Sequence, residues 1–117
     1  MARLSTHVLD TSRGVPAAGV VVELHAFADA DRRHVTTVTT NADGRTAEPL
    51  LSGDLIAPGV YELTFHAGDY FRAAGVALAD PAFLDLVVIR FGIADAAGHY
   101  HVPLLLSPYG YSTYRGS

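Results

Sequence analysis

Apolar and polar residues alternate along much of this 117-residue chain, and a two-residue period predicts β-strands rather than helices. The clearest stretches are Val20–Ala28, Val60–Ala67 and His99–Ser107, in which one face would pack on a core and the other would meet solvent. Leu84–Asp95 is β-branched and nearly continuously apolar, which predicts a well-covered strand. Shorter stretches that also fit strands are Leu4–Asp10, His34–Thr40 and Tyr111–Gly116.

The segments between these stretches are rich in turn-forming residues, such as SRGVPAAG, NADGR and SPYG. One segment, Gly68–Gly75, breaks the alternation and combines an early aspartate, good helix formers and a closing glycine, which predicts a short helix. Pro103 inside a strand pattern predicts an edge strand or a bulge. About seven or eight short strands and one helix indicate an all-β sandwich.

Composition excludes several classes of function. The chain has no cysteine, so disulfides, thiolate nucleophiles and Cys-type zinc sites are ruled out. All eight basic residues are arginine, which excludes Schiff-base chemistry on lysine. The net charge of -4 without a basic run argues against a nucleic-acid or membrane-surface partner. With no signal peptide and no stretch long enough to span a bilayer, we expect one cytoplasmic domain over residues 1–117.

Histidines are the main candidates for chemistry. His99 and His101 are two residues apart, so they share a strand face, and such a pair could hold zinc with His7 or an aspartate as a third ligand or could simply be solvated. His7 lies in a strand whose alternation is unclear, so it could equally be a core residue. His25 and His66 fall on the solvent faces of their strands by parity.

Three further features of the sequence bear on function. His34 follows DADRR and is expected in a solvated loop. Arg45 follows the NADG turn, where an arginine gains interest only beside something anionic or planar. No G-x-S-x-G nucleophile elbow and no Gly-rich phosphate loop is present, so serine-hydrolase and nucleotide-binding motifs find no support.

Several separate motifs resemble one known family. HYHVPLLLSPYGYSTYRGS closely resembles the C-terminal signature of the transthyretin-related 5-hydroxyisourate hydrolases, and the final tetrapeptide YRGS sets these enzymes apart from transthyretin hormone carriers. STHVLD followed by GVPAAGV is similar to the family's first strand and turn, TNADGR to its second motif, and GDYF to the start of its short helix. The resemblance runs from Leu4 to Ser117.

The resemblance implies a fold and an assembly. The fold would be a transthyretin-like (prealbumin-like) sandwich of two four-stranded sheets with one short helix near residues 69–75. Edge strands of two subunits would pair, and two such dimers would stack into a homotetramer whose active sites lie where the dimers meet. The reaction would be the metal-independent and cofactor-free hydrolysis of 5-hydroxyisourate, in urate degradation, to 2-oxo-4-hydroxy-4-carboxy-5-ureidoimidazoline.

The resemblance also assigns residues. His7, Arg45, His101 and Ser117 would be catalytic, and His7, Arg45, Tyr114, Arg115 and Gly116 would bind substrate. Such residue types suit the opening of a ring amide, because a histidine with a pKa of about 6.5 can move protons near neutral pH and an arginine can hold a planar anion.

Two alternatives remain open at the level of the sequence. One is a non-enzymatic transthyretin-like carrier of a small hydrophobic ligand, which would need apolar channel walls and none of these polar residues. The other is a zinc hydrolase built on His99, His101 and His7, which uses largely the same side chains. An adventitious metal at His99 and His101 is compatible with both the 5-hydroxyisourate hydrolase and the zinc hydrolase.

Overall fold

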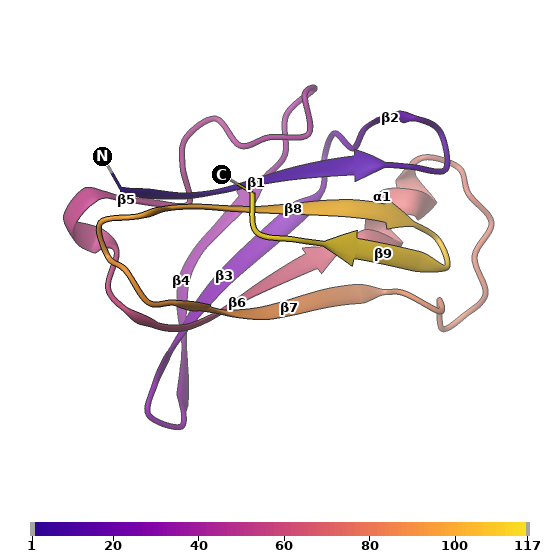
Figure 1. The fold of residues 1–117 in the computed structure, drawn as a ribbon. Coiled ribbons are helices and arrows are strands. Elements are labelled where there is room, and N and C mark those ends of the chain that lie inside the picture. Colours follow the sequence, from indigo (N-terminus) through magenta and orange to yellow (C-terminus); the bar gives the residue numbers. More distant parts are fainter. Residues whose placement is uncertain (1, 117) are drawn as a thin grey trace.

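Two packed β-sheets and one short α-helix make up residues 2–116, which are the residues that the computed structural model describes (Figure 1). The first sheet contains β1 (Arg3–Asp10), β2 (Val15–Pro16), β5 (Leu51–Ser52), β8 (His99–Ser107) and β9 (Gly110–Thr113). The second contains β3 (Val21–Ala28), β4 (Asp31–Thr39), β6 (Gly59–His66) and β7 (Leu86–Ile93). A 3-10 turn, η1 (Gly53–Leu55), follows β5, and α1 (Ala67–Ala73) follows β6. The predicted all-β sandwich with one short helix is confirmed, with a fifth strand in the first sheet.

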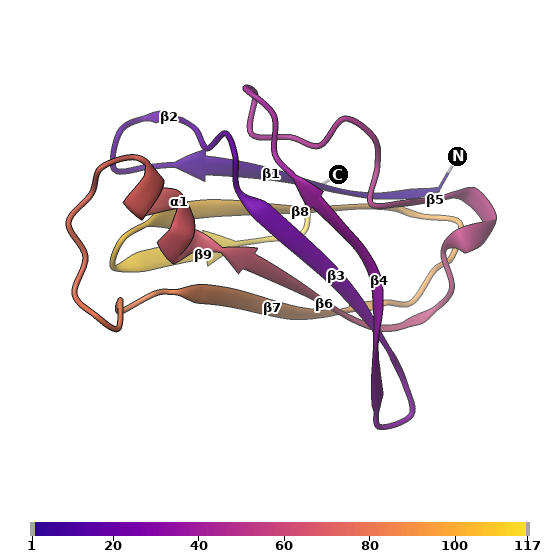
Figure 2. The same ribbon diagram turned by 180° about the vertical axis from the view of Figure 1, so that it is seen from behind.

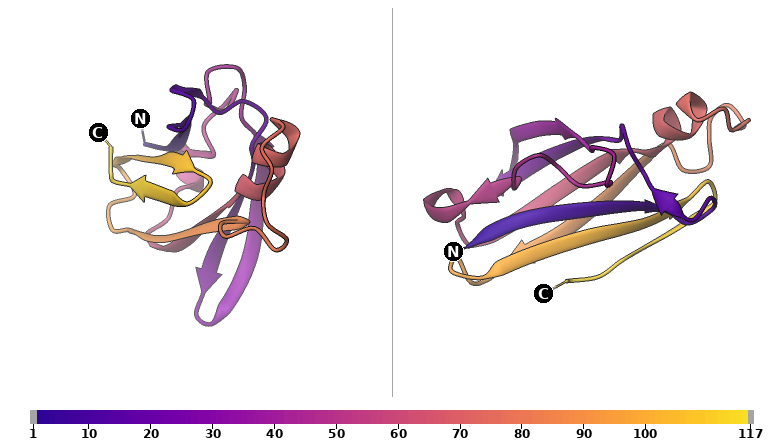
Figure 3. Two further views of the ribbon diagram at one scale, coloured as in Figure 1. Left: turned by 90° about the vertical axis from the view of Figure 1, so that its right-hand side faces the viewer. Right: turned by 90° about the horizontal axis from the view of Figure 1, so that it is seen from above.

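The strand order places distant parts of the chain side by side. The second sheet runs β4-β3-β6-β7 with every neighbouring pair antiparallel. The first runs β2-β1-β8-β9, with β5 also on β1, and its β1–β8 pair is parallel. Seen from the end of the sandwich, the sheets form two layers (Figure 3). The parallel pair matters most for function, because it sets the first strand against a strand from the last quarter of the chain.

Alternate side chains of the strands fill the space between the sheets. Leu4 and Leu104 from the first sheet, and Leu24, Leu63 and Phe65 from the second, are completely buried. Burying one such side chain contributes about 1.5–3 kcal/mol. The two-residue period of the sequence therefore separates core-facing from outward-facing positions, as predicted.

Strand β1 alternates more cleanly than its sequence indicates. Leu4, Thr6, Val8 and Asp10 are all buried, while the residues between them are not. Thr6 is accommodated because its Oγ1 donates a hydrogen bond to the carbonyl of Val102 at 2.7 Å. Because Thr6 and Asp10 are polar but buried, the hydrophobicity of β1 does not show this alternation. The outward face of β1 carries His7.

The position of Pro103 differs from the prediction. Strand β8 lies between β1 and β9, so Pro103 is in an inner strand and not at an edge. The carbonyl of Pro103 accepts a hydrogen bond from Thr113 Oγ1 at 2.8 Å, so its nitrogen also faces β9. The pairing of β8 with β9 begins only at Leu104. No carbonyl of β9 therefore lacks a partner because of the N–H that is missing from Pro103.

Two histidines of the second sheet also differ from expectation. His25 lies on the outward face, as its parity predicts, but it is only 6% exposed because neighbouring strands cover it. His34 is exposed as expected, yet it lies within β4 and not in a loop. The two rings pack edge to face with centroids 5.4 Å apart. Strand β4 begins at Asp31, whereas the apolar pattern predicts a start at His34.

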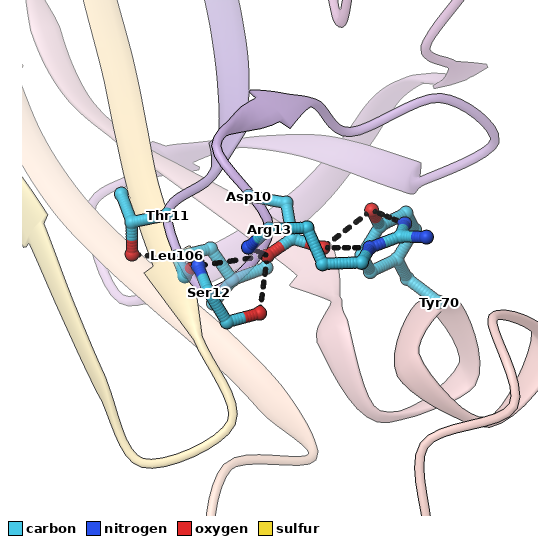
Figure 4. A network of polar contacts seen from close by, with 6 residues as sticks. All are labelled: Asp10, Thr11, Ser12, Arg13, Tyr70 and Leu106. Atoms are coloured by element: carbon cyan, nitrogen blue, oxygen red, sulfur yellow. Dashed lines mark hydrogen bonds and ion pairs between the residues drawn. The ribbon is translucent and has the colours of Figure 1, made fainter.

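A buried carboxylate joins β1 to the helix (Figure 4). Asp10 is 1% exposed and accepts hydrogen bonds from the backbone and hydroxyl of Ser12, from Arg13 Nε at 3.0 Å and from the Tyr70 hydroxyl at 2.8 Å. Arg13 also donates to the Tyr70 hydroxyl at 2.6 Å. These bonds hold α1 beside the β1–β2 turn, at one end of the sandwich (Figure 2).

Element ends differ slightly from those predicted. The helix starts and stops earlier than Gly68–Gly75, and β9 ends at Thr113 where a strand to Gly116 was expected. The two-residue strands β2 and β5 were not predicted, because they are too short to show a period. Among the described residues, no helix is long and apolar enough to cross a membrane.

Candidate active site

The outward faces of β1 and β8 carry a row of polar side chains. The parallel register places Arg3 opposite His99 and Ser5 opposite His101, with His7 one step further along β1. Residues two apart on a strand share a face, so these five side chains project from the same side of the first sheet. His99 and His101 therefore lie beside Arg3 and Ser5 on the outward face of the first sheet.

The NADGR loop brings Arg45 to this face. The Asn41 side chain accepts hydrogen bonds from the backbone N–H groups of Asp43 at 2.9 Å and Arg45 at 3.2 Å, which closes the loop. Gly44 has a φ of +75°, and a Cβ there would lie 2.3 Å from the carbonyl oxygen of Val8. Only glycine lets the loop approach β1 so closely. As a result Arg45 forms a β-bridge with His7.

His7 is held by the same loop. Its Nε2 lies 2.8 Å from the carbonyl oxygen of Asp43. A carbonyl can only accept a hydrogen bond, so Nε2 carries a proton and Nδ1 is the nitrogen with a lone pair when the ring is neutral. His7 is partly buried on the outward face of β1.

His101 is held from two sides. Its Nδ1 lies 2.9 Å from Ser5 Oγ. On its other side, the backbone N–H of Gly116 donates to the carbonyl of His101 at 2.7 Å, and a Cβ at Gly116 would lie 2.7 Å from the ring Cδ2. The chain after β9 therefore lies directly against this imidazole, and a side chain at Gly116 would displace it.

The electrostatic surroundings keep His101 neutral. Burial lowers the pKa of His101 below its usual value of 6.5, and Coulombic interactions with Arg45, His7 and Arg3 lower that pKa further. A neutral imidazole at neutral pH has a lone pair available to take up a proton.

A pocket of about 370 Å³ opens over this group, and its lining residues are Arg3, Ser5, Arg45, His99, Tyr100 and His101. A second pocket of about 230 Å³ shares Arg3, Ser5 and Arg45 and continues along the loop to Glu48 and Pro49. The pocket over His101 is mainly polar and both pockets carry arginines, which suits a planar polar or anionic molecule more than an apolar one.

Tyr114 and Arg115 lie elsewhere in this chain. They line a pocket of about 240 Å³ between β7 and β8, away from the pocket of His101. The Arg115 guanidinium stacks over the Tyr100 ring at 4.3 Å and donates to the carbonyl of His99 at 3.2 Å. Within one chain, the structure thus brings His7, Arg45, His101 and Gly116 together. Tyr114 lies in the other pocket, and Arg115 lines that pocket too while contacting His99 and Tyr100 of the His101 pocket. Ser117 lies outside the described residues.

Over residues 2–116, no group of three histidine, aspartate or glutamate side chains is arranged to hold a metal ion. His99 and His101 share a face, and Nδ1 of His101 lies 2.9 Å from Ser5 Oγ. Arg3 and Arg45 line the same pocket, and their positive charges disfavour a cation beside His101.

A family model described as the HIUase/Transthyretin family matches residues 4–116. This chain belongs to that family. A curated relative, 5-hydroxyisourate hydrolase 2 of Rhizobium meliloti, is 66% identical over 98% of this chain and 96% of its own length.

Two solved structures of the HIUase/Transthyretin fold illustrate the likeness. The 5-hydroxyisourate hydrolase of Klebsiella pneumoniae superposes with a TM-score of 0.82 at 38% identity and matches the full length of both chains. An (S)-allantoin synthase superposes with a TM-score of 0.94 at 43% identity, covering 99% of this chain. This chain spans 44% of the length of that synthase.

Sequence reasoning missed two residues of this HIUase/Transthyretin site, Arg3 and Ser5. Both lie on the outward face of β1, but the face assignment of that strand was unclear from sequence because Thr6 and Asp10 are buried. The signal that could have found them is spacing, since Arg3, Ser5 and His7 are each two residues apart and must share a face.

Proposed function

We propose that this chain is a 5-hydroxyisourate hydrolase that opens the ring amide of its substrate to give 2-oxo-4-hydroxy-4-carboxy-5-ureidoimidazoline. The 66% identity to a protein of that name, over nearly the whole of both chains, carries the proposal. The pocket supports it, because a neutral imidazole and arginine side chains lie around one polar cavity.

The reaction requires three things of the site. Water attacks the amide carbonyl, so a base must accept its proton. The carbonyl oxygen becomes negatively charged, which a positive group stabilises. The C–N bond then breaks, the nitrogen leaves with a proton, and the carbonyl carbon becomes a carboxylate.

The residues divide these roles. His7 and His101 activate water and return the proton to the leaving nitrogen, and Arg45 orients the substrate and stabilises the developing charge. Gly116 allows the chain end to approach His101, and Ser117 takes part in the chemistry. Tyr114 and Arg115 bind substrate. Because their side chains face another pocket of the same chain, we propose that they act on the site of a neighbouring subunit in a homotetramer.

An ultraviolet assay on freshly generated 5-hydroxyisourate tests the function directly. The wild-type chain should speed the loss of substrate and give a single stereoisomer of the product. His101→Asn should lower turnover by roughly 10²–10⁴-fold, the usual contribution of a general acid or base. His34→Asn removes an exposed histidine from the opposite sheet and serves as the matched control.

Three results would contradict the proposal. Wild-type protein without activity would point to the alternative, a transthyretin-like carrier. Full activity in His101→Asn would remove that residue from the mechanism. Activity lost on exhaustive chelation and restored by zinc would favour the zinc hydrolase of His99, His101 and His7.

A further inference from the structure

Ser5 is placed opposite His101 by the strand register. In the parallel β1–β8 pair these two residues are direct neighbours, and Ser5 Oγ lies 2.9 Å from Nδ1 of the ring. Across residues 2–116, the Ser5 hydroxyl makes no second hydrogen bond. The serine is partly buried at the wall of the 370 Å³ pocket, so this contact is shielded from bulk water on one side.

The rest of the ring is confined as well. The backbone of Gly116 lies against the Cδ2 edge, where an added Cβ would come within 2.7 Å of Cδ2 and 3.1 Å of the His101 Cβ. Ser5 covers Nδ1, and Gly116 covers the opposite edge. Nε2 is then the ring nitrogen left to meet a ligand, since within the described residues it has no hydrogen-bond partner.

We propose that Ser5 is a positioning residue for His101, and that its hydroxyl oxygen accepts a hydrogen bond from Nδ1–H so that Nε2 holds the reactive lone pair. This inference rests on the proposed function in so far as His101 handles a proton of the reaction. The same bond persists when Nε2 takes up a proton, because Nδ1–H donates in both charge states. The ring therefore needs no rotation during the reaction.

The two histidines then use different nitrogens. The Nε2–H of His7 is bound to the Asp43 carbonyl, which leaves Nδ1 of His7 for the reaction. His101 presents Nε2. Each ring is thus oriented by a neutral partner at its other nitrogen, which fixes the tautomer without adding a negative charge beside the arginines.

The test compares Ser5→Ala with Ser5→Thr, with Thr39→Ala as the control. Ser5→Ala removes the hydroxyl, Ser5→Thr keeps it, and Thr39→Ala removes an exposed hydroxyl from β4 in the other sheet. Ser5→Ala should lower kcat roughly 3- to 10-fold, the usual worth of one hydrogen bond, with little change in KM. Ser5→Thr should recover most of kcat, and Thr39→Ala should match wild type.

The tautomer is read separately by ¹⁵N NMR of the histidine rings without substrate. Wild type and Ser5→Thr should carry the proton of neutral His101 on Nδ1, and Ser5→Ala should show a mixture of both tautomers. A proton on Nε2 in wild type, or a Ser5→Ala protein with unchanged kcat and unchanged tautomer, would overturn the inference. This measurement needs no turnover, so an inactive wild-type protein would reject the proposed function alone. Wild-type and Ser5→Thr spectra still decide the question if Ser5→Ala does not fold.

Discussion

At the scale of single residues, charge around His101 decides whether the site has a base. Its pKa is lowered by burial, by Arg45, by His7 and by Arg3, and all of these disfavour the imidazolium form. Arg3 is the useful probe among them, because it is exposed and is the one arginine of this set that the mechanism does not use.

Arg3→Gln should move the acid limb of the kcat/KM profile to higher pH. Removing a positive charge raises the pKa of His101 toward 6.5, so its neutral form is lost earlier as the pH falls. Profiles measured at low and high salt check this, since screening should shrink the difference. Arg33→Gln makes the same charge change on β4 in the opposite sheet and should leave the limb in place. An unmoved or downward-shifted limb in Arg3→Gln would contradict this account.

The hydrogen bonds of Asp10 with Ser12, Arg13 and Tyr70 form a network, the Asp10 network, that connects β1, the following turn and α1. Burial alone would raise the pKa of Asp10, but hydrogen bonds from Ser12, Tyr70 and Arg13 outweigh it and hold that pKa below 3.8. A carboxyl whose pKa is lowered on folding stabilises the native state above its unfolded pKa. That stabilisation is lost as the pH falls through the native value.

Asp10→Asn should therefore lower the free energy of unfolding near neutral pH by about 2 kcal/mol, the scale of a buried hydrogen bond to a charged group. Chemical denaturation at a series of pH values measures this. The difference from wild type should narrow only below pH 3.8, where Asp10 becomes protonated in the wild-type protein as well. Asp69→Asn removes an exposed carboxylate from the same helix and should change stability little. An Asp10→Asn protein as stable as wild type at neutral pH would refute the network's role.

The edges of the two sheets and the C-terminal residues have separate roles in the proposed assembly. Strands β7 and β9 each form one edge of their sheet, and β7 carries Leu86 and Val88 exposed on its outward face. Unpaired edges with exposed apolar side chains are suited to pairing with another subunit. Tyr114 and Arg115 lie beyond β9, and Gly116 forms a single β-bridge with His101 of β8.

Deleting Arg115 to Ser117 should abolish hydrolysis and leave the proposed homotetramer largely intact. The deletion removes the chain that lies against His101, but it leaves both edge strands complete. Light scattering coupled to size-exclusion chromatography gives the mass, and the ultraviolet assay gives the activity. Normal turnover in the shortened chain would reject the role of the C-terminal residues, and a wild-type monomer would reject the tetramer.

Local patterns in the sequence were enough to predict the long strands, and its motifs were enough to predict the family. A two-residue period requires one face to be buried, so the strands around Leu24, Leu63 and Leu104 were predictable to within a few residues. The NADGR turn was predictable too, since its asparagine and glycine have local reasons to be there. The grouping of His7, Arg45 and His101 came from resemblance and not from spacing.

The choice of neighbouring strands and the burial of particular polar residues could not be predicted from local patterns, because both depend on the complete fold. The parallel β1–β8 register sets Ser5 against His101 across 96 positions of sequence, and no local pattern encodes such a pairing. Thr6 and Asp10 are buried because distant groups satisfy their hydrogen bonds, so hydrophobicity could not predict their burial. A residue period depends on neighbours a few positions away, whereas these hydrogen bonds depend on residues that are brought close only when the chain folds.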